Sequence, residues 1–574
     1  MVKTDNAPIL ELRDVTFKYA AQKEPTLKKL NLKIHAGELV VIAGASGSGK
    51  STLGRLISGL IPEAYPGDLT GDLLINGQVV NGQSIFERSQ AIGTVLQDTN
   101  AQFVGLSVAE DVAFALENDG VATDPMHAAV LEWLERLDLG QRMNLAPQFL
   151  SGGQKQRTAM AGVLIDESPI LLLDEPLASL DQQSGSDMLD LLDRLREERG
   201  LTIILIEHRL TQVLQHNLDQ LVILDAGQIQ SNTDALTAVQ TNCLPAYGLA
   251  EPLYIRLLKR AGIDLDETQQ LLLPEQVTAP HLAEKLASTI ADFPTLPTDN
   301  FGEPILTVEH LSYGYGPAEP LFKDVNFHLD AGEIVALVGK NGSGKSTLIN
   351  ILTGFITDKK MNGDLRLHNQ DLSKLSIKER ADVIGYVIQD PNLMLTQSSV
   401  YDEVALGLRL RGYEEADIET TVTDLLKTAG LYPMRNWPID SLSFGQKKRL
   451  SIIAILALRL EILILDEPTA GQDAYHAQKL IAFILKLKRE YELTILVVTH
   501  DMGLMCTIAD RSVVLVDGEI IANGTPAAIL ADQDVVTAGN LQATTVHTLL
   551  QRFDLVADTR VFRALTGQEA HNES

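Results

Sequence analysis

The chain has 574 residues, 45% of them hydrophobic, and its 76 Asp and Glu against 47 Lys and Arg give a formal net charge of −29. Such a length exceeds a single hydrophobic core and predicts several domains. The negative charge repels phosphate backbones, which argues against a general nucleic-acid-binding protein. The two cysteines, Cys243 and Cys506, lie far apart without metal-binding spacing, so we expect reduced packing residues and no zinc or iron–sulfur site.

Neither the N-terminus nor the most apolar stretch predicts a targeting or membrane segment. Residues 1–8 are polar and lack the charged-then-apolar layout of a secretory signal. Residues 450–465 are the best candidate span, but Arg459 and Glu461 interrupt them. A spanning helix needs about 20 largely uncharged residues. We therefore expect a chain that is soluble by itself.

The first elements along the chain are two strands and a glycine-rich turn. Alternating apolar residues predict strands over 9–15 and 30–34. The apolar run 39–43 then leads into Gly44-Ala45-Ser46-Gly47-Ser48-Gly49-Lys50-Ser51-Thr52, and an amphipathic helical pattern begins at Leu53. Strand, glycine-rich turn and helix form the context in which G-x-x-x-x-G-K-[ST] is a phosphate-binding loop.

This loop has the residue types that binding a phosphate requires. Small glycines let backbone N–H groups converge on an anion, and the following helix adds its positive N-terminal end. Lys50 is expected to reach the β- and γ-phosphates, and Ser51 to bind Mg²⁺. The alternative, a glycine-rich turn with a chance lysine, does not account for the strand before it and the helix after it.

The next elements predict a mainly parallel α/β core. A strand over 72–75 is turned by Asn76-Gly77, and residues 108–145 have the apolar spacing of helices. Two short buried strands follow at 170–173 and 202–206. Short buried strands that alternate with helices are typical of a parallel sheet covered on both faces.

Beyond this first unit the chain changes character. Residues 253–261 and 281–291 predict short helices, and the proline-rich stretch 293–300 predicts a linker. The tail after residue 537 has apolar helical patches but no chemical signal. We predict domain boundaries at residues 1–245, 246–303 (a helical extension and the linker), 304–536 and 537–574.

The whole first unit recurs in the second half of the chain. A second loop, Gly339-Lys340-Asn341-Gly342-Ser343-Gly344-Lys345-Ser346-Thr347, begins 295 positions after Gly44. Leu173-Asp174-Glu175-Pro176 recurs as Leu465-Asp466-Glu467-Pro468, 292 positions later. The first copy therefore carries three extra residues, which we expect within 61–67. The chain is a tandem duplication of one nucleotide-binding domain.

Acidic pairs end the predicted strands that face each loop. In phosphoryl transfer to water an Asp helps to hold Mg²⁺ while another group orients or deprotonates the water. Asp174 suits the first role and Glu175 the second, and Asp466 and Glu467 repeat them. Acidic pairs at strand ends are commonly just solvated, but two copies at matched positions favour the chemical role.

Histidines and glutamines also end strands in both copies. A lone His at a strand end is usually structural, but His208 and His500 fill the same position, which favours a contact to the γ-phosphate. Gln97 and Gln389 likewise recur at matched strand ends. Each alone would be interpreted as a surface glutamine.

A second glycine turn completes each copy. Ser151-Gly152-Gly153-Gln154 opens a predicted helix and recurs as Ser443-Phe444-Gly445-Gln446. Backbone N–H groups at such a helix start form another anion site. The combination of loop, acidic strand end and this turn resembles the ATP-binding-cassette (ABC) ATPases over most of the chain. The resemblance implies two tandem P-loop NTPase domains, each with a mainly parallel sheet core, a helical subdomain and an antiparallel β subdomain.

The resemblance also implies a role for each site residue. The two loops, Gly44–Thr52 and Gly339–Thr347, would be Walker A loops that bind ATP with Mg²⁺, and Ser151–Gln154 and Ser443–Gln446 the signature turns. Asp174 and Asp466 would end the Walker B strands. The catalytic glutamates would be Glu175 and Glu467, and the switch histidines His208 and His500. Gln97 and Gln389 would form the Q-loops and join Ser51, Ser346 and the two Asp residues as metal ligands. Residues 179–181 and 471–473 would be D-loops, and Tyr19 and Tyr315 would stack on adenine.

In such ATPases the signature turn of one domain closes over the nucleotide of the other. The resemblance therefore implies that Ser443–Gln446 caps ATP at Gly44–Thr52, and Ser151–Gln154 caps ATP at Gly339–Thr347, so that the two domains pair within one chain. Phe444 replaces a glycine, so the first composite site is expected to hydrolyse more slowly or to close differently. Both sites keep Lys, Asp, Glu and His, so neither is expected to be dead.

A narrower resemblance concerns residues 96–118. This run looks like the ATPases of energy-coupling-factor (ECF) importers, which carry vitamins or metal ions, whereas residues 402–408 fit less closely. A single-chain fused ATPase is similar to the form often assigned to hydroxymethylpyrimidine or thiamine uptake. The resemblance implies an integral-membrane coupling subunit and a substrate-binding membrane subunit as partners, no nucleic acid, and a peripheral location on the cytoplasmic face of the cell membrane.

Two alternatives remain open. A soluble tandem cassette acting on ribosomes or nucleic acid usually shows a basic surface, a long charged inter-domain helix or cysteine clusters, and this chain shows none of these in its sequence. The fused ATPase of a sugar importer is the other, because one fold serves many cargoes. The complete catalytic set in both halves favours the ECF type.

Overall fold

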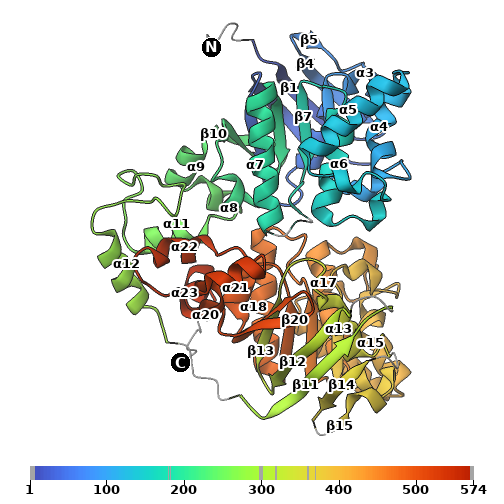
Figure 1. The fold of residues 1–574 in the computed structure, drawn as a ribbon, viewed down its shortest axis with the longest axis vertical. Coiled ribbons are helices and arrows are strands. Elements are labelled where there is room, and N and C mark those ends of the chain that lie inside the picture. The colour runs from blue at the N-terminus through green and yellow to red at the C-terminus, as the bar shows by residue number, and fades with distance from the viewer. Residues whose placement is uncertain are drawn as a thin grey trace. The chain divides into compact units, whose positions relative to one another are not determined.

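The computed structural model describes residues 7–178, 180, 182–295, 301–316, 320–357, 361–368 and 370–568. They divide into two compact units (Figure 1). Unit 1 comprises residues 1–255 and 265–278, and unit 2 comprises 256–264 and 279–574. Within the described residues each unit holds a six-stranded, mainly parallel sheet and a four-stranded antiparallel sheet, so the predicted fold class is confirmed.

Unit 1 builds its larger sheet in the order β10-β9-β3-β8-β7-β6 and its smaller one in the order β2-β1-β4-β5. Its strands are β1 (Leu10–Tyr19), β2 (Leu27–Ile34), β3 (Leu39–Ala43), β4 (Gly67–Ile75), β5 (Gln78–Val79), β6 (Ile92–Val95), β7 (Ile170–Asp174), β8 (Thr202–Ile206), β9 (Gln220–Asp225) and β10 (Gln228–Thr233). Its helices are α1 (Lys50–Ile57), α2 (Leu60–Glu63), α3 (Ile85–Ser89), α4 (Val108–Asn118), α5 (Thr123–Arg136), α6 (Gly152–Leu164), α7 (Gln182–Arg199), α8 (Leu210–Val213), α9 (Ala235–Gln240) and α10 (Cys243–Ala246), with 3₁₀ turns at η1 (Thr99–Ala101), η2 (Gly140–Arg142) and η3 (Pro147–Phe149).

Unit 2 repeats this plan with the orders β16-β17-β18-β13-β19-β20 and β12-β11-β14-β15. Its strands are β11 (Pro304–Tyr313), β12 (Phe322–Asp330), β13 (Ile334–Val338), β14 (Asn362–Leu367), β15 (Gln370–Asp371), β16 (Ile384–Val387), β17 (Ile462–Asp466), β18 (Thr494–Val498), β19 (Arg511–Val516) and β20 (Glu519–Gly524). Its helices are α13 (Lys345–Thr353), α14 (Ile377–Arg380), α15 (Val400–Leu410), α16 (Glu415–Thr428), α17 (Phe444–Leu456), α18 (Ala474–Tyr491), α19 (Met502–Ile508), α20 (Pro526–Ala531), α21 (Gln533–Ala538), α22 (Thr545–Gln551) and α23 (Thr559–Thr566), with 3₁₀ turns at η4 (Leu372–Lys374), η5 (Pro391–Leu393), η6 (Tyr432–Met434) and η7 (Ile439–Ser441).

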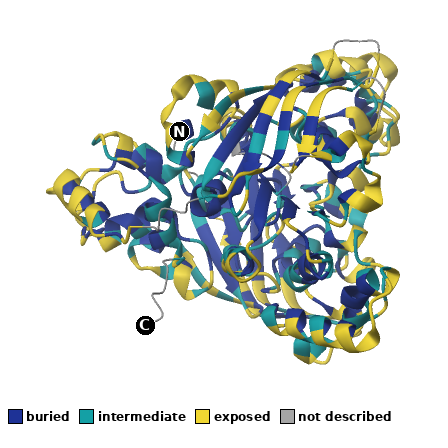
Figure 2. Ribbon diagram, turned by 90° about the horizontal axis from the view of Figure 1, so that it is seen from below, coloured by how far each residue is buried: buried dark blue, intermediate teal, exposed yellow. Residues whose placement is uncertain are grey.

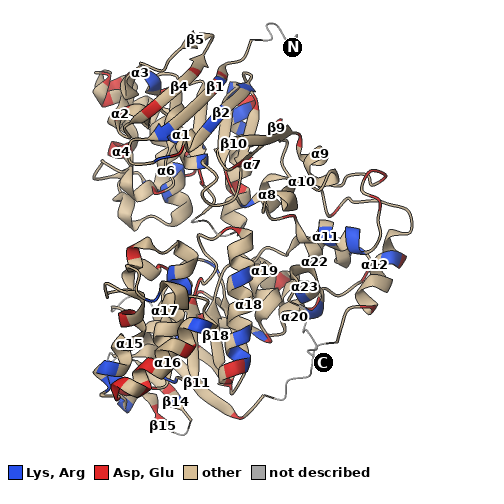
Figure 3. Ribbon diagram, turned by 180° about the vertical axis from the view of Figure 1, so that it is seen from behind, with Lys and Arg blue, Asp and Glu red and all other residues tan. Residues whose placement is uncertain are grey.

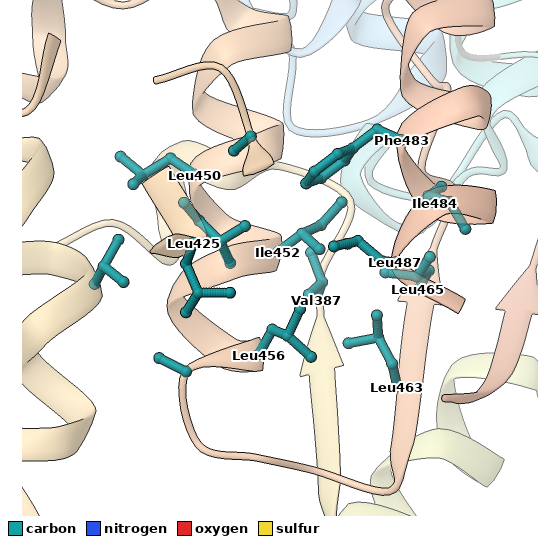
Figure 4. Packing of buried hydrophobic residues seen from close by; sticks show 14 of the residues in the cluster. Val387, Leu425, Leu450, Ile452, Leu456, Leu463, Leu465, Phe483, Ile484 and Leu487 are labelled. Atoms are coloured by element: carbon teal, nitrogen blue, oxygen red, sulfur yellow. The ribbon is translucent and has the colours of Figure 1, made fainter. Parts of the chain in front are cut away.

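The central strands are apolar throughout because both faces of the parallel sheet are covered. In β17, Leu463 and Leu465 join one buried cluster while Ile462 and Ile464 join the other. This follows from the alternation of side chains along a strand. Figure 4 shows the first cluster, in which residues of α17 and α18 pack over β16 and β17, and Figure 2 shows the strands as buried ribbon between exposed loops.

Most predicted elements are present, with shifted ends. The strand at 202–206 is confirmed as β8, and the strand at 9–15 continues to Tyr19 in β1. Asn76 and Gly77 both have positive φ, as the predicted tight hairpin turn requires. The helical region 108–145 divides into α4, α5 and η2.

The segment between the copies forms α11 (Leu253–Arg260) and α12 (Leu282–Ala291), close to the predicted helices. Basic residues of α11 (Figure 3) bind the C-terminal end of α23. Arg256 donates to the carbonyl oxygen of Leu565 (3.2 Å), and Arg260 to that of Ala564 (2.9 Å). Such cations complement the negative end of a helix. The tail thus has a structural role in unit 2.

Part of the predicted linker, residues 296–300, lies outside the described residues, and the predicted domain boundaries stay predictions. In the part of the chain that the structure describes, no helix has the length and apolar character needed to cross a bilayer.

Candidate active sites

Each phosphate loop lies between the end of a central strand and the start of a helix. In unit 1, β3 ends at Ala43 and α1 begins at Lys50. A Cβ on Gly44 would lie 2.2 Å from the carbonyl oxygen of Leu224, so only glycine fits there. Gly49, the residue before α1, has φ 109°, which is accessible mainly to glycine. The sequence thus forces the tight turn that exposes backbone N–H groups.

Both loops carry polar side chains that could bind an anion. The Lys50 ammonium donates to the carbonyl oxygens of Gly44 (2.8 Å) and Ala45 (3.0 Å), and Lys345 does the same to Gly339 and Lys340. Among the described residues, the buried hydroxyls of Ser48 and Ser343 have no hydrogen-bond partner. Unused donors around an open glycine turn fit the phosphates of a nucleotide.

The acidic pair of unit 1 lies at the carboxyl end of β7. Glu175 has φ 49°, a left-handed conformation that is uncommon for a side chain of this kind. Its Oε2 accepts a hydrogen bond from the Gln97 amide (2.7 Å), and its Oε1 lies 3.5 Å from Nδ1 of His208. Glu175, Gln97 and His208, far apart in sequence, therefore meet at one point.

Burial and mutual repulsion set the charges of this pair. Burial, with the charge of Glu175, raises the pKa of Asp174 to about 6, although Arg55 and Lys50 counteract this. Burial also acts to raise the pKa of Glu175, but its interactions with His208 and Lys50 prevail and lower it. Glu175 is therefore ionised at neutral pH, as a proton acceptor must be.

Asp174 also has the features of a metal ligand. Its Oδ1 is buried and has no hydrogen-bond partner among the described residues. A cation nearby would both satisfy this oxygen and favour its charged form. The hydroxyl of Ser51, the carboxylate of Asp174 and the amide oxygen of Gln97 are the hard oxygen donors that Mg²⁺ prefers. The residues present fit the ion.

Unit 2 repeats this geometry with different neighbours. Glu467 has φ 42°, and its Oε1 lies 2.7 Å from Nδ1 of His500. Its Oε2 accepts from the Thr499 hydroxyl (3.2 Å). Oδ2 of Asp466 accepts from the Tyr386 hydroxyl (3.0 Å), and burial raises the pKa of Asp466.

The signature turns open α6 and α17. Ser151 and Ser443 are N-caps, and each forms a capping box with the glutamine three residues later. The next two N–H groups of each helix remain available to an anion. Phe444 is partly exposed, and its ring lies beside Gly471: a Cβ there would be 3.7 Å from the ring. The phenyl group therefore lies against Gly471 of its own unit, within the segment 471–473 that is predicted to be a D-loop.

The aromatic residues lie beside the first helical turn after each loop. The Tyr19 hydroxyl is hydrogen bonded to that of Thr52 (3.1 Å), and Tyr315 to Thr347 at the same distance. Tyr315 is 67% exposed, and its ring makes a T-shaped contact with that of Tyr313. In the D-loops, Asp473 caps α18, whereas Ser179 and Asp181 lie outside the described residues.

Sequence reasoning missed four residues that the structure places around the two sites. They are Glu207 and Thr499, which precede the histidines, and Tyr386 and Lys448, which contact Asp466 and the segment at Gln389 respectively. Each lies at a position where the two copies differ. A position-by-position comparison of the copies would have identified them.

Comparison with known proteins gives matches over most of the chain. A family model described as "ABC transporter" matches residues 27–178 and 322–470, and one described as "ATP-binding cassette cobalt transporter" matches 241–313. Proteins named as ABC transporter ATP-binding proteins are 46% identical in Lactiplantibacillus plantarum (96% of this chain, 97% of that one) and 45% identical in Streptococcus pneumoniae (95% and 96%).

Among solved structures, cbiO1 from Clostridium perfringens, described as part of the ABC transporter complex cbiONQ, is 33% identical. The match covers 43% of this chain and 99% of that one, with a TM-score of 0.39.

Proposed function

The chain belongs to the ABC transporter ATP-binding proteins, and we propose that it powers a membrane importer of the ECF type. Its two ATPase domains bind ATP and hydrolyse it to drive transport. The proposal extends this activity to the direction of transport, the cargo and the partners. The observation that carries it is that both units bring a complete set of loop lysine, acidic pair and histidine to one strand edge.

In the proposed mechanism each side chain has one task. Backbone N–H groups of the loops hold the phosphates, and Lys50 and Lys345 leave their loop carbonyls for the β- and γ-phosphates. Glu175 and Glu467 orient the attacking water and accept its proton, while His208 and His500 position them. Mg²⁺, when bound, neutralises phosphate charge.

We also propose that the signature turn of each unit caps the loop of the other. The available N–H groups at the start of α6 and α17 support this, because a second set of donors neutralises charge that one loop leaves uncompensated. Closure on ATP and reopening after hydrolysis would then move the membrane partner.

For the cargo we propose a metal ion or a vitamin-like compound. The match of residues 241–313 to the cobalt-transporter model supports a metal ion, and the run 96–118 supports the ECF type. The partners would be an integral-membrane coupling subunit and a substrate-binding membrane subunit, which would hold the chain at the cytoplasmic face of the cell membrane.

Detergent extraction tests this proposal. The full-length chain, tagged and purified from its own cells with ATP present, should bring down small integral-membrane proteins in fixed proportion. Identification of these partners by mass spectrometry defines the cargo class. Recovery of ribosomal proteins in their place would contradict the transporter assignment, and recovery of a sugar-transporter subunit would contradict the ECF type.

A further inference from the structure

The two signature helices differ at one fully buried position. In α17, Lys448 is 0% exposed, and its ammonium donates to the carbonyl oxygens of Ile388 (2.9 Å) and Gln389 (2.7 Å). These carbonyls belong to the segment that follows β16. Figure 4 shows α17 packed beside the end of that strand at Val387. Lys448 thus ties the helix that begins at the signature turn to the segment that carries Gln389.

The same position in unit 1 makes no such tie. Gln156 of α6 is 2% exposed, and its Nε2 has no hydrogen-bond partner among the described residues. The corresponding segment of unit 1, which follows β6, is stabilised by one of its own side chains. Gln102 accepts from the Leu96 N–H (3.1 Å) and donates to the Thr94 carbonyl (3.1 Å). In unit 2 the residue at this place is Met394, whose sulfur accepts from the Ile388 N–H (3.3 Å).

A second hydrogen bond joins the signature helix to the same segment in both units, and it serves as a control for the bonds of Lys448. Lys155 donates to the Asn100 side chain (2.8 Å), and Lys447 donates to that of Asn392 (2.9 Å). Both bonds lie at the surface. The two buried hydrogen bonds of Lys448, which we call the brace, therefore occur in unit 2 and, among the described residues, not at the matched position of unit 1.

The chemistry of this brace makes it strong. Burial lowers the pKa of Lys448 to about 8, although the charges of Asp466, Asp390 and Glu467 counteract this, so the side chain is still cationic at neutral pH. Hydrogen bonds from a charged donor are stronger than neutral ones. Separation of the two parts would leave a buried charge without partners, which is strongly unfavourable.

We propose that Lys448 is a positioning residue that makes residues 388–389 and α17 move as one body. A ligand-induced shift at Gln389 would then be delivered directly to Ser443–Gln446. In unit 1 the corresponding parts share the solvent-exposed bond between Lys155 and Asn100, but the buried Gln156 adds no second bond among the described residues, so a shift at Gln97 reaches Ser151–Gln154 less directly. This inference rests on the proposed function of Gln389 as a contact to the phosphate or its metal ion.

Hydrogen exchange on the full-length chain tests the brace, with and without ATP and Mg²⁺. The background is Lys50→Ala, Glu467→Gln, which should leave ATP only the loop Gly339–Thr347, so that protection of 443–448 does not come from the proposed capping of ATP at Gly44–Thr52. With Lys448 present, ATP should slow exchange in both 388–394 and 443–448. The Lys448→Gln variant carries the residue found in unit 1. It should keep the ATP-dependent protection at 388–394, whereas the ATP-dependent slowing of exchange at 443–448 should decrease by about fivefold or more. Lys447→Gln, which removes only the surface tie, should keep both.

The outcomes separate the brace from the proposed function. Equal ATP-dependent protection at 443–448 with and without Lys448 overturns the brace. Absence of protection at 388–394 in the parent contradicts the role of Gln389 and, with it, this inference. If Lys448→Gln disturbs exchange throughout unit 2, the variant Gln156→Lys decides, in a Lys345→Ala, Glu175→Gln background that should leave ATP only the loop Gly44–Thr52. A transferred tie should increase the ATP-dependent protection of 151–156 together with that of 96–100, and an unchanged response overturns the proposal.

Discussion

Glu175 and Glu467, the two glutamates proposed as general bases, occupy equivalent backbone positions but are held by different groups. Glu467 accepts hydrogen bonds from Thr499 and His500, its immediate structural neighbours. Glu175 accepts one from Gln97, and His208 stands further off at 3.5 Å. The duplication therefore preserves the two glutamates and their left-handed backbone, while the groups that hydrogen bond to them differ.

The residue before each histidine explains much of this difference. Thr499 in unit 2 donates to Glu467. Its counterpart Glu207 is fully buried and has no hydroxyl to donate: one oxygen accepts from the N–H groups of His208 and Arg209, and the other has no partner among the described residues. His208 thus lies between two carboxylates. His500, by contrast, is hydrogen bonded to the carboxylate of Glu467.

The largest effect is expected from a variant that removes the glutamate carboxylates of both sites. The double variant Glu175→Gln, Glu467→Gln should lower ATP hydrolysis by about 10²-fold or more, because a general base is lost at both sites. ATP binding should persist, since the loops are intact. Steady-state phosphate release and equilibrium nucleotide binding measure the two properties. Hydrolysis at the parental rate would show that these glutamates are not the bases.

The single variants sharpen the comparison between the sites. Glu175→Gln should stop hydrolysis of nucleotide bound at Gly44–Thr52, and Glu467→Gln that of nucleotide bound at Gly339–Thr347. Each single variant is the matched control for the other in a site-resolved trapping assay.

The next largest effect concerns the signature turns. Ser443→Arg should impair trapping at Gly44–Thr52 rather than at Gly339–Thr347, because a bulky cation replaces the N-cap of α17 and blocks its N–H groups. Loss of one such set of donors costs about 10²-fold in catalysis. Ser151→Arg is the reciprocal control. If each variant impairs the loop of its own unit, capping across the units is wrong.

The sequence was sufficient to predict the fold and the turns that form the two loops, for physical reasons, whereas the roles of the site residues stay predictions. Gly44 and Gly49 are required by close approach and by positive φ, and apolar runs such as 202–206 require a sheet buried on both sides. These constraints are local, so they are visible in short stretches. The hydrogen-bond partners of the acidic pairs were not predicted, because Gln97 meets Glu175 and Tyr386 meets Asp466 only through the order of the strands.

A smaller effect follows from exchanging the residues before the histidines. The charge of Glu207 helps to raise the pKa of His208, against the effect of burial and together with Glu175. Glu207→Thr should therefore lower that pKa, and nuclear magnetic resonance titration of the imidazole measures it. Protonated His208 stabilises the fold fully below the ordinary His pKa of about 6.5, and this contribution is lost as pH rises through the raised value. The variant should reduce this acid-side stabilisation.

Thr499→Val is its counterpart in unit 2. It removes one hydrogen bond to Glu467 at nearly constant shape, which is expected to slow hydrolysis at Gly339–Thr347 by about fivefold, equivalent to about 1 kcal/mol. Val at this position adds no charge, so the pKa of His208 should not change. A pKa of His208 that is the same with Glu207→Thr as in the parent would show that Glu207 does not act on the histidine.

The smallest expected effect belongs to Tyr386, which supports Asp466 in unit 2 where unit 1 has Thr94 in the matched strand. The hydroxyl of Tyr386 donates to Oδ2 of Asp466 and acts to lower its pKa, against burial, which raises it. Tyr386→Phe keeps the ring but removes the donor, so the carboxylate becomes less well oriented and less readily charged. The Mg²⁺ concentration for half-maximal hydrolysis at Gly339–Thr347 should rise by about threefold to fivefold, the equivalent of one neutral hydrogen bond. The site at Gly44–Thr52, whose Asp174 has an Oδ1 without a partner among the described residues, serves as the internal control and should not change. An equal rise at both sites would mean that the tyrosine stabilises the whole chain and does not orient the aspartate of its own unit.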